Sequence, residues 1–135
     1  MPFLIGGVLA LAVVALARQV GFDRDRAFYP TLVIVVASYY VLFAVLSGSP
    51  HTILAEAVVM AAFAGVAIVG FRSRPWIAIA ALAGHGLFDA VHGHVLHNAG
   101  MPVWWPAFCG SFDLVAGAAC VPSLRRRQPS PGHSV

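Results

Sequence analysis

The sequence predicts an all-α fold in which five helices cross a membrane, and three observations indicate it. Of the 135 residues, 60% are hydrophobic and only 10% are charged, whereas soluble domains carry roughly 25% charged residues. Five apolar segments approach or reach the roughly 17 to 25 residues that a helix needs to cross a bilayer. The arginines fall only at alternate connections between these segments. We expect one transmembrane helical domain over residues 1–122 and a disordered cytoplasmic tail over residues 123–135.

The five expected helices cover residues 3–17, 29–46, 53–71, 76–96 and 104–121. The first is the shortest, and its end at Ala15-Leu16-Ala17 looks like the cleavage site of a signal peptide. A signal peptide begins with a positive charge before its apolar run, and none precedes this one. We therefore favour a retained helix over a cleaved one.

Aromatic residues mark both the interfaces and the interior of these segments. Trp76 stands at the start of the fourth segment and Trp104 and Trp105 at the start of the fifth, as in the aromatic belts of membrane proteins. Tyr39 and Tyr40 lie near the centre of the second segment, where a hydroxyl needs a hydrogen-bond partner. We expect that partner to be the backbone of a neighbouring helix.

Small residues recur at every fourth position in two segments. Ala57, Ala61 and Gly65 do so in the third, and Ala80 and Gly84 in the fourth. This spacing lets membrane helices approach closely. We expect the third and fourth helices to touch.

The basic residues predict how the helices are oriented. All eight are arginines, and they follow the first, third and fifth segments: Arg18, Arg24, Arg26, Arg72, Arg74, Arg125, Arg126 and Arg127. The connections at residues 47–52 and 97–103 contain no Arg or Lys, so the positive-inside rule predicts an outer N-terminus and a cytoplasmic C-terminus. Because the arginines are scattered over helix ends and form no basic face, we do not expect the protein to bind a nucleic acid. We expect its partner to be the lipid bilayer, in a bacterial plasma (inner) membrane.

Five ionisable residues inside the expected spans, where charge is costly, are candidates for a functional site. They are Glu56 in the third, His85, Asp89 and His92 in the fourth, and Asp113 in the fifth. At 100° per residue, the three on the fourth helix share one face. A rise of 1.5 Å per residue places all five in the outer half of the bilayer. The sequence therefore predicts one polar site built from three helices.

Four further residues are less informative. His94 points away from the shared face, and His97 lies at the exit of the fourth helix. Cys109 shares a face with the aspartate four residues later, but cysteine is also an ordinary apolar filler. Cys109 and Cys120 are eleven residues apart on one expected helix, which is too far for a disulfide within the chain.

These residue types favour a metal ion. His, Asp and Glu bind Zn, Fe or Mn, and residues three or four apart on a helix can hold one ion together. His85 with Asp89, or Asp89 with His92, has that spacing, but the two histidines are about 10 Å apart along the axis. Either one histidine contacts a ligand without binding the ion itself, or Asp89 bridges two ions. The alternative is a structural cluster in which the buried groups neutralise one another.

The pattern of Glu56, His85-x-x-x-Asp89-x-x-His92, a Gly and Pro turn, and Cys109-x-x-x-Asp113 resembles a bacterial family of small membrane proteins known as domain of unknown function 6010. The resemblance covers about residues 55–120. It implies a multi-span fold with the two histidines and two aspartates as shared polar residues, and it implies no activity. This chain has Gly93 where that family places a second adjacent histidine, so no role is implied for His94.

The function that we expect is a membrane-embedded hydrolase acting on a lipid or other apolar substrate, in which Zn or Fe activates a water. The ion would be held by His85, Asp89, His92 and Asp113, with Glu56 or Asp89 as the proton acceptor. A small ion or proton carrier would need to form a homo-oligomer because the chain is short and shows no inverted repeat. An accessory subunit of a membrane complex, with a structural polar cluster, is the third possibility.

Overall fold

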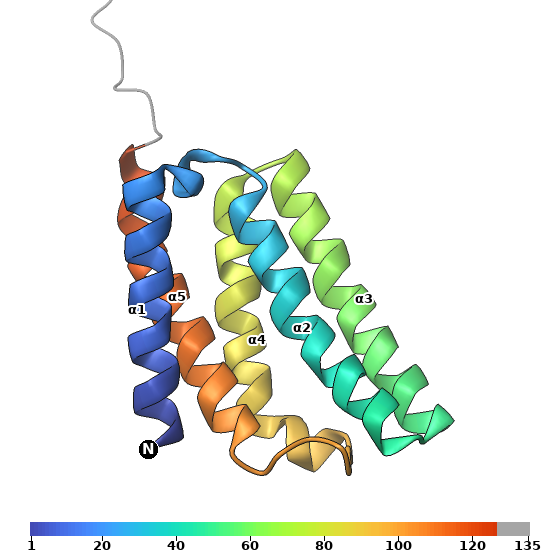
Figure 1. Cartoon of the computed structure of the whole chain (residues 1–135). Coiled ribbons are helices and arrows are strands. Elements are labelled where there is room, and N and C mark those ends of the chain that lie inside the picture. The colour runs from blue at the N-terminus through green and yellow to red at the C-terminus, as the bar shows by residue number, and fades with distance from the viewer. Residues whose placement is uncertain (127–135) are drawn as a thin grey trace, which may run out of the picture.

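The computed structural model describes residues 1–126, and these form a bundle of five α-helices with no strand among them (Figure 1). The helices are α1 (Pro2–Val20), α2 (Phe28–Ser47), α3 (Pro50–Arg72), α4 (Pro75–Val95) and α5 (Trp105–Arg126), and a single 3-10 turn, η1 (Phe22–Arg24), joins α1 to α2. The predicted all-α class is confirmed. Most of the helices run past the predicted apolar segments, so that Arg18 and Arg72 lie in last helical turns and not after them.

Within the described part of the chain, four helices are long and apolar enough to cross a membrane, namely α1, α2, α3 and α5. Helix α4 has a similar length, at 21 residues, but its histidines and its aspartate make it less apolar. It packs against α2, α3 and α5, with α1 on the far side of α5 (Figure 1). Neighbouring helices therefore cover the polar residues His85, Asp89 and His92 of α4.

The predicted start of a disordered tail at residue 123 is wrong for residues 123–126, which continue α5. Pro122 lies inside this helix without ending it. The buried Ser123 donates a hydrogen bond from Oγ to Asp23 Oδ2 at 3.3 Å, which ties the last turns of α5 to η1. The rest of the predicted tail lies outside the described residues.

The helix ends explain the tight connections. Helices α1 and α2 end at Gly21 and Gly48, whose φ angles of 89° and 71° lie in the left-handed region that glycine adopts easily. Helix α3 begins with a proline after Ser49, whose side chain accepts a hydrogen bond from the Thr52 backbone N–H. These turns make α2 and α3 an antiparallel pair (Figure 1).

Helices α3 and α4 do touch, as predicted, but on a different face of α3. The stripe of Ala61 and Gly65 is exposed, and nothing lies near the Cβ position of Gly84. The contact is made instead at Gly70, where an added Cβ would lie 2.7 Å from the backbone nitrogen of Ala78. A repeat of small residues shows that close approach is possible but not toward which neighbour. The rotation of α3 buries Glu56, which finds polar partners inside the bundle.

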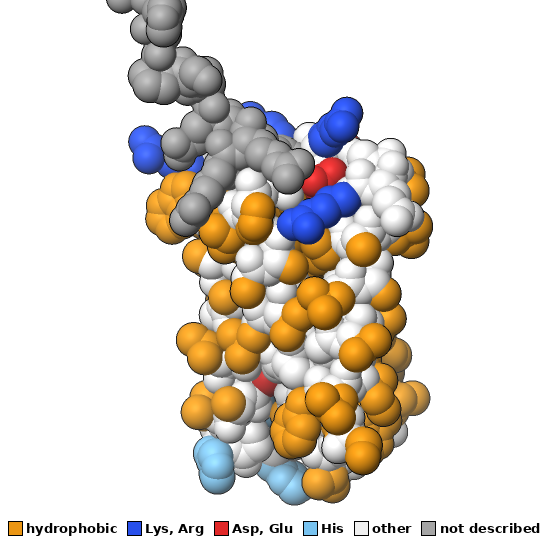
Figure 2. Space-filling view, turned by 90° about the vertical axis from the view of Figure 1, so that its left-hand side faces the viewer, with side chains coloured by type: hydrophobic (Ala, Val, Ile, Leu, Met, Phe, Trp, Pro, Cys, Tyr) orange, Lys and Arg blue, Asp and Glu red, His pale blue; other side chains and the backbone are white. Residues whose placement is uncertain are grey.

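The arginines and the exposed histidines lie at opposite ends of the bundle. Figure 2 shows arginine side chains at one end, histidines at the other, and mostly apolar side chains between them. Arg26 joins the α1–α2 and α3–α4 connections by donating to the carbonyls of Phe71 and Ser73 at 2.9 and 3.3 Å. Arg18 donates to the carbonyl of Ala119 and so links the ends of α1 and α5. The connections predicted to lie on one side of the membrane thus lie at one end of the fold.

Candidate metal centre

The three polar residues predicted to share a face of α4 all point into the bundle. His85, Asp89 and His92 are buried, and each contacts a polar side chain of another helix. The face predicted from helical spacing is therefore confirmed. Each residue has a different partner, however, so the face divides into two polar groups.

The first group, called the His85 group here, consists of His85, Asp89, Cys109 and Asp113. One ligand atom from each residue lies within 4.8 Å of the others, and all four residues are buried. His85 Nδ1 lies 2.7 Å from Asp113 Oδ2 and 3.7 Å from Asp89 Oδ2. Two residues come from α4 and two from α5, each pair at i, i+4. This is the spacing at which two side chains of one helix reach a common point.

Two glycines bring these helices close enough to form the His85 group. A Cβ added to Gly86 would lie 2.9 Å from the carbonyl oxygen of Gly110 and 3.0 Å from Asp113 Cβ. A Cβ added to Gly110 would lie 3.1 Å from the carbonyl oxygen of Gly86 and 3.2 Å from Asp89 Cβ. Any side chain at these positions must push the helices apart. The distance between the two aspartates therefore depends on glycine at the crossing.

Tyr40 is a member of the site that the sequence did not predict. Its hydroxyl donates to Asp89 Oδ1 at 2.6 Å, so the expected backbone partner is wrong for this tyrosine. Its ring centroid lies 4.1 Å from that of His92 and 5.8 Å from that of His85. Tyr39 instead lies at the surface, with its ring 5.1 Å from Trp105. The depth of Tyr40 in the second segment, similar to that of Asp89, was the available signal.

The second group, called the His92 group here, consists of His92, Glu56 and Asn98. His92 Nε2 lies 2.9 and 3.2 Å from the two oxygens of Glu56. Asn98, in the connection after α4, donates from Nδ2 to Glu56 Oε1 and to the Tyr40 carbonyl, each at 3.0 Å. The two predicted residues His92 and Glu56 are thus brought together, but neither belongs to the His85 group. Asn98 was missed because a loop residue carries no helical periodicity.

The remaining candidates are two histidines and two cysteines. His94 and His97 are exposed. Cys109 and Cys120 are both free and buried, and Cys120 lies outside the His85 group. Cys109, by contrast, belongs to that group, as the fourth candidate ligand in place of the predicted His92.

The donor set of the His85 group fits a divalent metal ion. Asp89 Oδ2 and Asp113 Oδ1 are buried and have no hydrogen-bond partner within residues 1–126, although buried polar atoms are nearly always paired. An imidazole nitrogen, a thiolate sulfur and two carboxylate oxygens are ligands of Zn and Fe, and three of them would leave one tetrahedral position for water. The two carboxylates and a Cys109 thiolate would more than balance the charge of a divalent ion, which lowers the cost of burying it.

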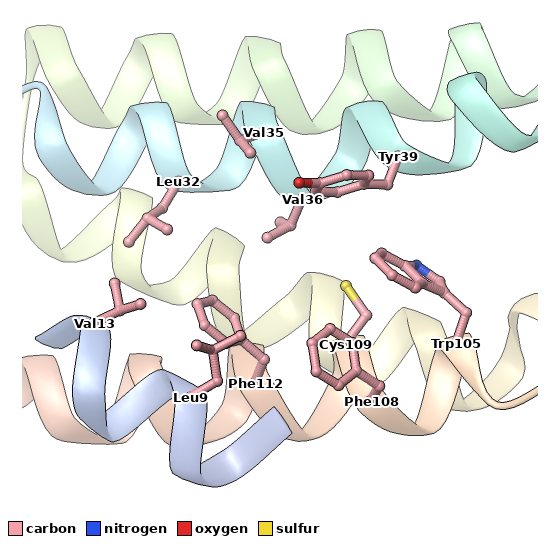
Figure 3. A pocket seen from close by; sticks show the side chains of 10 residues that line it. All are labelled: Leu9, Val13, Leu32, Val35, Val36, Tyr39, Trp105, Phe108, Cys109 and Phe112. Carbon is pink, nitrogen blue, oxygen red and sulfur yellow. The ribbon is translucent and has the colours of Figure 1, made fainter. Parts of the chain in front are cut away.

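Two cavities border the His85 group on different sides. One of about 440 Å³ lies between α1, α2 and α5 and includes Cys109, whose sulfur points into it (Figure 3). The other, of about 450 Å³, lies between α4, α5 and the start of α1 and includes Asp89, Gly110 and Ser111. Figure 2 shows an acidic side chain recessed in the apolar face that contains α1 and α5. The group is buried in the protein yet within reach of both cavities.

Replacing Tyr40 with Phe is expected to lower the thermal stability of the protein. The change leaves a buried carboxylate oxygen without its donor, which costs about 1–3 kcal/mol. Tyr39→Phe is the matched control, because that hydroxyl lies at the surface. Thermal unfolding in detergent measures both, and equal melting temperatures for the two variants would mean that the Tyr40 hydroxyl does not hold Asp89.

Searches of protein-family models, curated proteins and solved structures find no match to this chain. The resemblance described above therefore stays a prediction. The functional argument rests on the geometry of the two polar groups and the cavities beside them.

Proposed function

We propose that the protein is a five-span integral membrane protein of the plasma membrane with an outer N-terminus and a cytoplasmic C-terminus. The support is the apolar surface between the two ends of the bundle and the arginines gathered at one end (Figure 2). Helix α4 is the fifth span in this arrangement, since its buried polar residues His85, Asp89 and His92 face other helices and not lipid. The two polar groups then lie toward the outer face.

We further propose that the His85 group binds Zn or Fe. The observation that carries this proposal is the convergence of four buried ligand atoms within 4.8 Å, two of them from carboxylates that each have one oxygen without a hydrogen-bond partner in the described structure. His92 takes a supporting role in this scheme. Its partner is Glu56, and its ring stacks on Tyr40, which holds Asp89.

The reaction that this site supports best is hydrolysis of a lipid or other apolar substrate. A divalent ion held by His85, Cys109 and Asp113 would supply a Lewis acid and make water nucleophilic at neutral pH. Asp89 would accept a proton, because Tyr40 fixes Oδ1, Oδ2 has no hydrogen-bond partner within the described residues, and the residue lines the 450 Å³ cavity. The 440 Å³ cavity offers a separate apolar approach at Cys109. Glu56 keeps a positioning role through His92.

Hydrolysis of a long-chain chromogenic ester by purified protein in mixed micelles tests this proposal. We expect turnover when Zn²⁺ is supplied, loss of turnover with a chelator, and a large decrease in kcat for Asp89→Asn. His94→Ala is the control, because that side chain is exposed and outside both polar groups. Turnover by Asp89→Asn equal to that of His94→Ala, or no turnover by the metal-loaded protein, would contradict a hydrolase.

A further inference from the structure

We infer that the 440 Å³ cavity is a groove that holds one acyl chain of a membrane lipid, with the ester end of the chain beside Trp105 and Cys109. The inference rests on the proposed function for the identity of the reaction, and it deepens that function by naming the substrate class. The volume falls within the roughly 300–1,000 Å³ of small-molecule sites.

The groove is open to the bilayer at its rim and closed at its floor. One wall is formed by α1 and α5 and the other by α2 (Figure 3). At the rim, Leu9 and Val35 are each 43% exposed. At the floor, Val36, Cys109 and Phe112 are buried. A hydrocarbon chain can therefore enter sideways from the lipid and reach Cys109 without crossing a polar region.

The lining selects a chain without charge. The groove contains no ionisable side chain other than the tyrosine hydroxyl of Tyr39 and the thiol of Cys109, and the remaining lining residues are apolar or aromatic. A charged headgroup would lose its hydration inside it with no compensating partner. An acyl chain loses nothing, because its surroundings in the bilayer are equally apolar.

One polar atom indicates which end of the chain lies where. Trp105 Nε1 is buried without a hydrogen-bond partner in the described structure, and it can donate to an ester carbonyl. Trp105 begins α5, and Cys109 follows one turn deeper. Toward the other end, the groove is lined by Leu32 and Val13 (Figure 3). With its ester end near Trp105 and its tail toward Leu32, a lipid of the outer leaflet would keep the orientation that it has in the bilayer, with its headgroup toward the outer face.

Alkylation of Cys109 tests the inference in the full chain. Cys120→Ala leaves Cys109 as the one thiol, and a chelator keeps it free of metal. N-dodecylmaleimide, which has a hydrocarbon tail, is expected to label Cys109, and methyl oleate is expected to slow labelling several-fold. Adduct formation is followed by mass spectrometry.

Two variants and a control show whether the groove is the route. Val36→Trp fills the floor, and Leu9→Trp narrows the rim should the first variant fold poorly; each is expected to slow labelling several-fold. Val66→Trp adds the same side chain on the exposed surface of α3 and is expected to leave the rate unchanged. Slowing by methyl oleate in a protein that never binds metal would refute the proposed function but support the groove.

Three outcomes would overturn the groove. The first is an equal labelling rate in the groove variants and in Val66→Trp, and the second is a labelling rate that methyl oleate does not change. The third is labelling of Cys109 that slows as protein concentration rises, together with the detection of cross-linked dimers. The last would identify a second copy of the chain as the occupant.

Discussion

Replacing Gly86 with alanine is expected to destabilise the bundle, whereas the same change at Gly84, half a helical turn away, is not. A Cβ at residue 86 would lie 2.9 Å from a backbone oxygen of α5, so the helices must separate. Overpacking of this kind costs about 1–3 kcal/mol. Nothing lies within 4 Å of the Cβ position of Gly84, and alanine there gains up to about 1 kcal/mol of helix propensity.

The two substitutions should therefore shift the melting temperature in opposite directions. Thermal unfolding of both variants in the same detergent measures this difference. We also expect Gly86→Ala to lose bound metal at temperatures where it stays folded, because separating α4 from α5 separates the two aspartates. Equal melting temperatures, or full metal content in Gly86→Ala, would mean that the glycine crossing does not set the geometry of the site.

His85→Ala and Asp113→Asn are each expected to abolish metal binding. Each change removes one of four candidate ligand atoms and, for the aspartate, one of the negative charges that offset a divalent ion. Elemental analysis of purified protein should find about one ion per chain in the parent and none in these variants. Affinity should fall as pH is lowered, because protons compete for the same ligand atoms.

Matched controls separate ligands from neighbours. His94→Ala tests loss of an exposed histidine from α4, and Cys120→Ala tests loss of a buried cysteine outside the His85 group; both should retain the ion. His92→Ala should also retain it, with lower affinity, because His92 is paired with Glu56. Loss of the ion from His92→Ala alone would restore the ligand set first predicted from the sequence. If the parent protein binds no metal and the His85 and Asp113 variants are less stable than it, a structural cluster would be favoured.

The architecture could be predicted from the sequence because its signals are local. Apolar run length gave all five helices, and the 100° repeat gave the buried face of α4. The free state of the two cysteines followed from their separation along one helix. The helix boundaries were less accurate, as at residues 123–126, because Ser123 is fixed by a tertiary contact to Asp23 that no local pattern reveals.

The division into two polar groups could not be predicted, because it depends on how each helix is rotated and where the helices cross. Both histidines of α4 face inward, but His85 meets α5 at the Gly86 crossing while His92 meets α3. Spacing along one helix says nothing of this choice. Cys109 and Tyr40 entered the site for the same reason, since their roles depend on neighbours from other helices.

X-ray absorption at the metal edge of the purified, metal-loaded protein is the most direct measurement of the proposed centre. We expect one sulfur ligand at about 2.3 Å together with nitrogen and oxygen ligands at about 2.0–2.2 Å. The sulfur signal should disappear in Cys109→Ala and persist in Cys120→Ala. An ion without any sulfur ligand, or a sulfur signal that survives in Cys109→Ala, would show that the His85 group is not the binding site.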